Sequence, residues 1–140
     1  LQPIVIAITG SFGKTSTKYY LDTILTERFA VLKTPESFNT LLGICRIING
    51  ELRAHHRIFI AEIGAYLPGD VAEKCRLLSP QIGVITAIGP EHFERFKSMD
   101  RIIQTHRELI DSLPDDGFCA VNVEEQYGRS LAEHHRPLRT

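Results

Sequence analysis

The stretch Ile8-Thr9-Gly10-Ser11-Phe12-Gly13-Lys14-Thr15-Ser16-Thr17 decides the fold that this sequence predicts. It follows an apolar run, residues 4–8, that has the character of a buried strand. It precedes residues 17–28, in which apolar side chains recur at helical spacing. A strand, a glycine-rich turn, a Lys-Thr pair and a helix in this order are typical of a phosphate-binding loop.

The chemistry of such a loop follows from its backbone. Glycines let N–H groups close around an oxyanion, and the N-terminus of the helix adds donors and a favourable dipole. Lys14 would neutralise the β and γ phosphates of a nucleotide, and the Thr15 hydroxyl would bind Mg²⁺. Ile8 stands where the longer G-x-x-x-x-G-K-[ST] motif has a glycine, and a short glycine turn can also be a plain strand–helix connection. The residues expected to hold the nucleotide are Gly10, Ser11, Gly13, Lys14, Thr15 and Ser16.

Composition narrows the class of protein. The 140 residues are enough for one domain with a real core, and 43% hydrophobic and 24% charged residues are ordinary for a soluble globular chain. A net charge of −1 gives no electrostatic case for nucleic-acid or membrane binding. No apolar run reaches membrane-spanning length, and no signal peptide is visible. Three cysteines without metal-ligand spacing favour free thiols in a cytoplasmic protein.

Strand and helix patterns alternate along the chain. Continuous apolar strands separated by helices predict an α/β fold, with a mostly parallel sheet flanked by helices on both faces. We expect strands at 4–8, 29–32, 57–63, 82–88 and 118–123, and helices at 17–28, 41–52, 68–78, 99–113 and 124–134. The chain begins at Leu1 and has one internal methionine, Met99, so we expect an excised segment of a longer protein.

The unusual polar residues follow the predicted strands. Ligands of open α/β sheets bind beyond the carboxyl ends of the strands, and segments 10–15, 34–40, 62–64 and 89–92 lie there. Glu62 interrupts an otherwise apolar strand, so it needs a partner or a metal, unless it points to solvent at the strand end. His92 follows another buried strand and is either a surface residue or part of the site.

With these segments assembled, the chain resembles the central, ATP-binding domain of the Mur ligases. The resemblance runs from Ile6 to about Val123 and rests on several blocks in order, which are residues 9–16, 34–43, 61–65, 92–96, 113–117 and 121–122. It implies a P-loop NTPase-like fold and flanking domains, an N-terminal one for the UDP-sugar and a C-terminal one, that residues 1–140 lack.

The resemblance also implies a reaction and a set of roles. ATP would phosphorylate the carboxylate of a UDP-MurNAc-peptide, and the amine of D-alanyl-D-alanine or another amino-acid substrate would attack the acyl phosphate. Lys14, Glu62 and His92 match catalytic positions of the family, with Thr15 and Glu62 on one Mg²⁺ and His92 near a second. Asn39 and Thr40 lie where relatives contact the nucleotide-sugar. We expect a monomer with no nucleic-acid partner and no membrane insertion.

One position departs from the family's pattern. Relatives place a carbamylated lysine, which helps to hold the second metal, in the helix after the His92 segment, and the matching residue here is His106. Its spacing from Ile102, Ile103 and Leu109 predicts an inward-pointing side chain. It is either a core histidine or a neutral imidazole near the second metal, although imidazole is a poor ligand for Mg²⁺.

Two alternatives to this function stay open. The first is another ligase of the same superfamily, of the folylpolyglutamate type or a recycling ligase. The second is a nucleotide-binding pseudo-enzyme, which His106 favours slightly and which the retained Lys14, Thr15, Glu62 and His92 oppose. The histidine pairs 55–56 and 134–135 are interpreted as solvated and receive no function.

Overall fold

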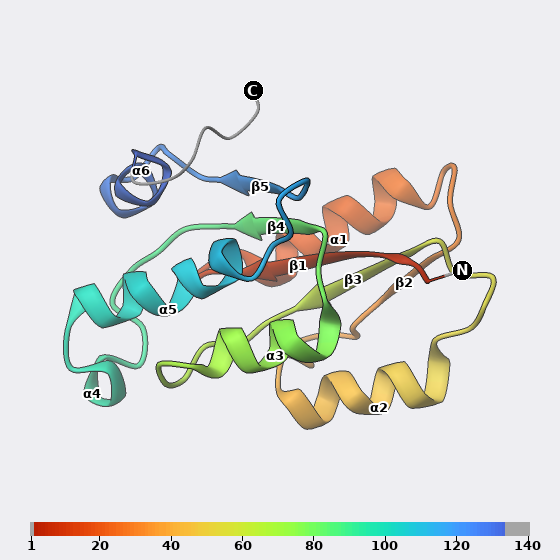
Figure 1. Ribbon diagram of the computed structural model, residues 1–140, viewed down its shortest axis with the longest axis horizontal. Helices are drawn as coiled ribbons and strands as arrows, with labels where there is room; N and C mark the ends of the chain where they lie inside the picture. Colours follow the sequence, from red (N-terminus) through yellow and green to blue (C-terminus); the bar gives the residue numbers. More distant parts are fainter. Residues whose placement is uncertain (1, 134–140) are drawn as a thin grey trace.

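A computed structural model describes residues 2–133 and contains a sheet of five parallel strands in the order β2-β3-β1-β4-β5 (Figure 1). The strands are β1 (Ile4–Thr9), β2 (Val31–Lys33), β3 (Ile58–Glu62), β4 (Ile82–Ile85) and β5 (Phe118–Val121). The central strand β1 pairs Ile8 with Glu62 on one side and with Val84 on the other. The predicted parallel α/β fold is confirmed.

Helices cover both faces of the sheet. Figure 1 shows α1 on one face and α2, α3 and α5 on the opposite face. The alternation of β1 explains this arrangement, because Ile6 and Ile8 pack toward Leu21 and Leu25 of α1, whereas the intervening side chains join the larger core on the other face. The helices are α1 (Lys14–Leu25), α2 (Leu41–Glu51), α3 (Asp70–Leu78), α4 (Phe93–Phe96), α5 (Met99–Asp111) and α6 (Gln126–Glu133).

Several predicted boundaries were wrong. The first helix begins at Lys14 and ends at Leu25 rather than covering 17–28, because Gly13 takes a left-handed φ of 85° and lets the helix start directly after the loop. The second strand lies at Val31–Lys33 rather than 29–32. The fourth strand ends at Ile85 rather than at residue 88, since the chain then turns to contact the phosphate-binding loop.

Smaller differences occur elsewhere. The four-residue helix α4 was not predicted, because a single turn carries no periodicity. The last helix begins at Gln126, and its predicted end at residue 134 lies outside the described residues, as does the histidine pair 134–135. The remaining predicted elements lie within about two residues of their observed bounds.

The cysteines have free thiols, as the sequence predicts. All three are free, and Cys75 and Cys119 are buried. Burial raises the pKa of the Cys75 thiol to about 11 and that of Cys119 to about 12, so both stay protonated at neutral pH. No helix in residues 2–133 is both long enough and apolar enough to cross a membrane.

Candidate active site

The phosphate-binding loop is braced by the segment that follows β4. The amides of Ser11 and Phe12 donate to the carbonyl of Ala87, at 2.8 and 3.3 Å. The Ser11 hydroxyl lies 3.0 Å from both the carbonyl and the amide of Gly89. Gly10 has a φ of 142°, and a Cβ there would collide with the side chain of Thr86. These contacts hold the loop against the segment after β4, and they give the amide and the hydroxyl of Ser11 partners within the protein.

Lys14 folds back over the loop that precedes it. Its ammonium donates to the carbonyl of Gly10 at 2.6 Å and lies 4.0 Å from Glu91. Lys14 itself lines the pocket of the loop, so it is held beside the place where a phosphate would bind. A bound phosphate would give the ammonium a charged oxygen in place of the neutral carbonyl of Gly10.

Glu62 lies at the carboxyl end of β3 and is 1% exposed. The Thr15 hydroxyl donates to its two carboxylate oxygens, at 3.1 and 3.0 Å. The backbone amide of Glu62 donates to the hydroxyl of the buried Thr34, which fixes the end of the strand. Glu62 therefore points into the protein beside the loop, and not to solvent.

The loop before α2 contributes two of the predicted residues. Asn39 is 9% exposed, and its amide nitrogen lies 3.4 Å from Glu62. The hydroxyl of Tyr66 donates to the other end of the Asn39 amide at 3.2 Å. Thr40 is exposed and caps α2 by accepting a hydrogen bond from Gly43. Asn39 thus belongs to the Glu62 cluster, whereas the structure gives Thr40 a capping contact.

His92 follows β4 and stands at the start of α4. It has a left-handed φ of 48°, its Nε2 lies 3.3 Å from Glu91, and its ring packs on Tyr66 with a centroid distance of 4.9 Å. Glu91 therefore lies near both His92 and Lys14. Tyr66, which the sequence analysis missed, connects the His92 ring to Asn39.

His106 points inward, as predicted, and is 1% exposed. Its Nδ1 lies 3.0 Å from the Thr9 hydroxyl, which also lies 3.4 Å from the carbonyl of Ile63. Burial, with a smaller contribution from Lys14, lowers the pKa of His106 to about 4. If Thr9 donates to Ile63, Nδ1 carries the proton and Nε2 keeps a free lone pair. The side chain is a neutral imidazole at neutral pH.

The carboxylate of Glu62 and the hydroxyl of Thr15 are hard oxygen ligands that suit Mg²⁺. Within residues 2–133, no three His, Cys, Asp or Glu side chains gather into a metal site, so Glu62, His92 and His106 do not form one together. A protein that supplies one carboxylate and one hydroxyl, and leaves the remaining positions to water and phosphate oxygens, is the usual arrangement for Mg²⁺. The residues present therefore fit this ion.

Two buried lysines near Glu62 were not foreseen. Lys18 is fully buried, and its ammonium lies 2.9 Å from Glu62. Lys74 is 4% exposed and donates to the carbonyl of Gly64 at 2.7 Å. Burial lowers the pKa of Lys74. Lys18 could have been found from its position one helical turn after Thr15, on the same face of α1. The sequence analysis missed it because it placed the start of that helix at residue 17.

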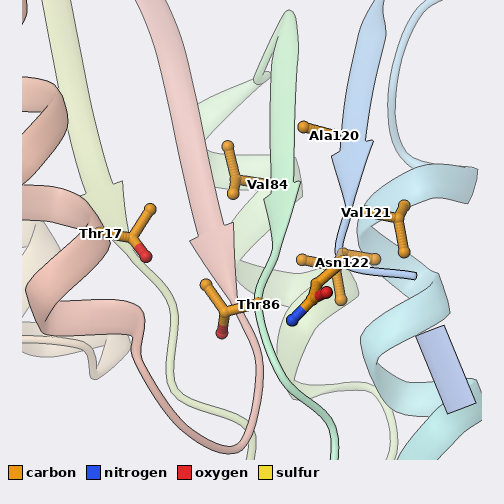
Figure 2. Close-up of a pocket in the computed structure, with 7 residues that line it drawn as sticks. Thr17, Val84, Thr86, Ala120, Val121 and Asn122 are labelled. Carbon is orange, nitrogen blue, oxygen red and sulfur yellow. The ribbon is translucent and has the colours of Figure 1, made fainter. Parts of the chain in front are cut away.

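Two pockets open at this edge of the sheet. One, of about 370 Å³, is lined by residues 11–16 of the loop and by Ser37, Asn39 and Glu62. The other, of about 290 Å³, lies between α1 and the ends of β4 and β5. Figure 2 shows Thr17, Thr86 and Asn122 around it, with the apolar side chains of Val84 and Val121 nearby. Thr86 also donates to the carbonyl of Phe12 at 2.7 Å, so the second pocket adjoins the loop.

A parallel sheet with such a loop after its first strand, and an acid at the end of the neighbouring strand, defines the class of P-loop nucleotide-binding domains. The family model described as the Mur ligase middle domain matches residues 8–138. The chain belongs to this family.

Relatives that are similar to this chain are named as particular enzymes of the family. The chain is 33% identical over 129 residues to UDP-N-acetylmuramoyl-tripeptide–D-alanyl-D-alanine ligase of Mycobacterium leprae, covering 92% of the chain and 25% of that protein. The same enzyme of Rickettsia prowazekii is 34% identical, with 91% and 28% covered. The chain therefore spans about a quarter of the length of these relatives.

Solved structures of named ligases superpose on most of this chain. MurF from Acinetobacter baumannii superposes with a TM-score of 0.86 at 30% identity, over 93% of this chain and 28% of that one. MurF ligase from Thermotoga maritima, in complex with ADP, gives a TM-score of 0.85 at 29% identity, over 94% and 30%. A pseudomurein peptide ligase from Methanothermus fervidus shares the fold, with a TM-score of 0.76 at 20% identity.

Proposed function

We propose that this chain is the ATP-binding part of an amide ligase that joins D-alanyl-D-alanine to a UDP-MurNAc-tripeptide in peptidoglycan synthesis. The observation that carries the proposal is the hydrogen bond between Thr15 and Glu62, which line one pocket together with Lys14. The chain is also about one-third identical to ligases of that name. We place the enzyme in the cytoplasm, as a monomer with further domains on either side of this one.

Different residues would bind the phosphates, the Mg²⁺ and the nucleoside of ATP. Lys14 and the N-terminus of α1 would hold the terminal phosphates, together with the other loop residues. Thr15 and Glu62 would hold Mg²⁺, which offsets the charge of the phosphates when bound. The pocket in Figure 2 would take the nucleoside, with apolar walls from β4 and β5 and the Asn122 amide to hydrogen-bond the base.

Activation of the carboxylate brings two anions together. A carboxylate oxygen attacks the γ-phosphorus, ADP leaves, and an acyl phosphate forms. The amine then attacks the carbonyl carbon, and inorganic phosphate leaves with the shared oxygen. Lys14 stands where it could stabilise the charge that moves to the leaving group. We assign to His92, which contacts Glu91 and Tyr66, and to Asn39 the contacts with the UDP-MurNAc-tripeptide.

His106 would serve in place of the carbamylated lysine of the family's pattern. Its neutral imidazole could accept a hydrogen bond from a metal-bound water through Nε2 more readily than it could bind Mg²⁺ directly. We therefore expect the whole enzyme to work without CO₂ or bicarbonate. The contact of Nδ1 with the Thr9 hydroxyl would orient the ring for this role.

The test is ADP release by the whole protein with UDP-MurNAc-tripeptide and one acceptor at a time. We expect release to depend on D-alanyl-D-alanine and not on glutamate, and Lys14→Ala to lower turnover at least ~100-fold, since loss of one transition-state contact costs ~3 kcal/mol. ADP release with a folate and glutamate, and not with UDP-MurNAc-tripeptide and D-alanyl-D-alanine, would instead favour a folylpolyglutamate-type ligase. A protein that binds nucleotide and ligates neither pair of substrates would be a pseudo-enzyme.

A further inference from the structure

Glu62 is held from two different sides. The pocket side carries Thr15 and Asn39, which line the cavity together with Glu62 itself. The protein side carries Lys18, which does not line the cavity and is fully buried. A bound cation would reach Glu62 from the pocket, so Lys18 and the cation would approach the carboxylate from opposite sides.

The two carboxylate oxygens are not equivalent. Oε2 accepts a hydrogen bond from the Lys18 ammonium at 2.9 Å, whereas the nearest amide to Oε1, that of Asn39, lies at 3.4 Å. The Thr15 hydroxyl lies at 3.0 and 3.1 Å from the two oxygens and does not distinguish them. Lys18 makes the shorter and charged contact, so it biases the carboxylate and leaves Oε1 as the oxygen with weaker protein contacts.

Lys18 is itself fixed in place. Its ammonium also donates to the carbonyl of Glu36, in the loop between β2 and α2. With 0% exposure and two protein acceptors, the side chain has no solvent into which it can turn. The position of Oε2 is thus set by α1 and by the loop before α2 together.

The number of Glu62 carboxylate oxygens available to a cation affects the selectivity between Mg²⁺ and Ca²⁺. Mg²⁺ requires near-octahedral geometry with short bonds and takes carboxylates through one oxygen, while Ca²⁺ accepts six to eight ligands and often binds a carboxylate through both oxygens. We propose that Lys18 is a specificity-determining residue that confines Glu62 to one metal-binding oxygen and so favours Mg²⁺ over Ca²⁺. This inference rests on the proposed function, because it takes Glu62 to be the ligand of the nucleotide's cation.

The experiment measures binding of a fluorescent, non-hydrolysable ATP analogue to the whole protein, with Mg²⁺ or Ca²⁺ as the only divalent ion. Loss of the lysine charge affects both ions alike, so the readout is the ratio of the two affinities. In Lys18→Met we expect the ratio of Mg²⁺ affinity to Ca²⁺ affinity to fall by up to ~10-fold, because the freed Oε2 lets Glu62 bind Ca²⁺ through both oxygens. Lys18→Gln keeps a donor for Oε2 and should retain most of the preference.

The matched control is Lys33→Met, which removes an ammonium from a partly exposed ion pair with Asp22 and should leave the ratio unchanged. Circular dichroism and thermal denaturation check that each variant folds. A folded Lys18→Met protein with the wild-type ratio would overturn the inference, and so would failure of both Lys18 variants to fold, which would make the residue structural. Wild-type protein that binds the analogue with neither ion would overturn the proposed function itself.

Discussion

The imidazole of His106 is buried between α5 and β1 with the Thr9 hydroxyl as its hydrogen-bond partner. Its lowered pKa has a consequence for stability. The unfolded chain takes up a proton near the ordinary pKa of 6.5, whereas the folded chain does so only near 4. Between these values the unfolded state binds more protons, so the free energy of unfolding falls as the pH falls.

We predict that the protein loses about 2 kcal/mol of stability between about pH 7 and pH 5 through this residue alone. Thermal or denaturant unfolding at the two pH values measures it. His106→Leu should reduce the pH dependence by that amount. An unchanged pH dependence in His106→Leu would mean that the buried imidazole is charged in the folded state.

The same leucine variant separates the two interpretations of His106. A core histidine can be replaced with little effect on turnover, whereas a residue that orients a metal-bound water cannot. Turnover of the whole enzyme, compared with its stability, distinguishes the two. A fully active leucine variant would exclude a role in catalysis.

Single residues also show what the sequence could reveal. The meeting of Thr15 with Glu62 was predictable, because both follow adjacent parallel strands at their carboxyl ends. Lys18 and Tyr66 were not, since their roles depend on where a helix starts and on which rotamer a long side chain takes. The roles assigned to the site residues remain predictions.

Among the elements, α3 and α5 are joined by one carboxylate. Glu108 of α5 accepts hydrogen bonds from the amides of Gly69 and Ala72 at the start of α3, at 2.7 and 2.9 Å. These donors have no partner within their own helix, and a negative charge there also interacts favourably with the helix dipole. The contact fixes the helix that carries Lys74 and faces the larger core.

Glu108→Ala should therefore lower the free energy of unfolding by about 1–2 kcal/mol, through the loss of two charge-assisted hydrogen bonds. Chemical denaturation measures the change. Glu51→Ala, at the exposed end of α2, is the control and should alter stability by less than about 0.5 kcal/mol. Equal effects of the two substitutions would show that the cap contributes nothing.

The order of strands and helices could be derived from apolar runs and their spacing, and it was confirmed. The ends of the elements could not, because they depend on contacts between distant segments. β4 ends where Thr86 and Ala87 turn to hold the loop, and no local pattern marks that position. The one-turn helix α4 is too short to leave a periodic signal.

At the scale of the whole molecule, the parallel sheet places the carboxyl ends of four strands at one edge. The segments that follow these strands, including the phosphate-binding loop, therefore form a single site. The order β2-β3-β1-β4-β5 places β1, with its loop, between the strand that carries Glu62 and the strand that leads to His92. Our central claim is that this edge transfers the γ-phosphoryl group of ATP to a carboxylate. The chain spans about a quarter of its relatives, so the claim must be tested on the whole protein.

The most direct test follows an oxygen atom. UDP-MurNAc-tripeptide is labelled with a heavy oxygen isotope in the carboxylate that reacts, and the inorganic phosphate released during ligation is analysed by mass spectrometry. Our account predicts that each phosphate carries one oxygen from that carboxylate, because the acyl phosphate shares it. Phosphate that forms during ligation without the label would contradict the account, since it would show that the carboxylate never attacked ATP.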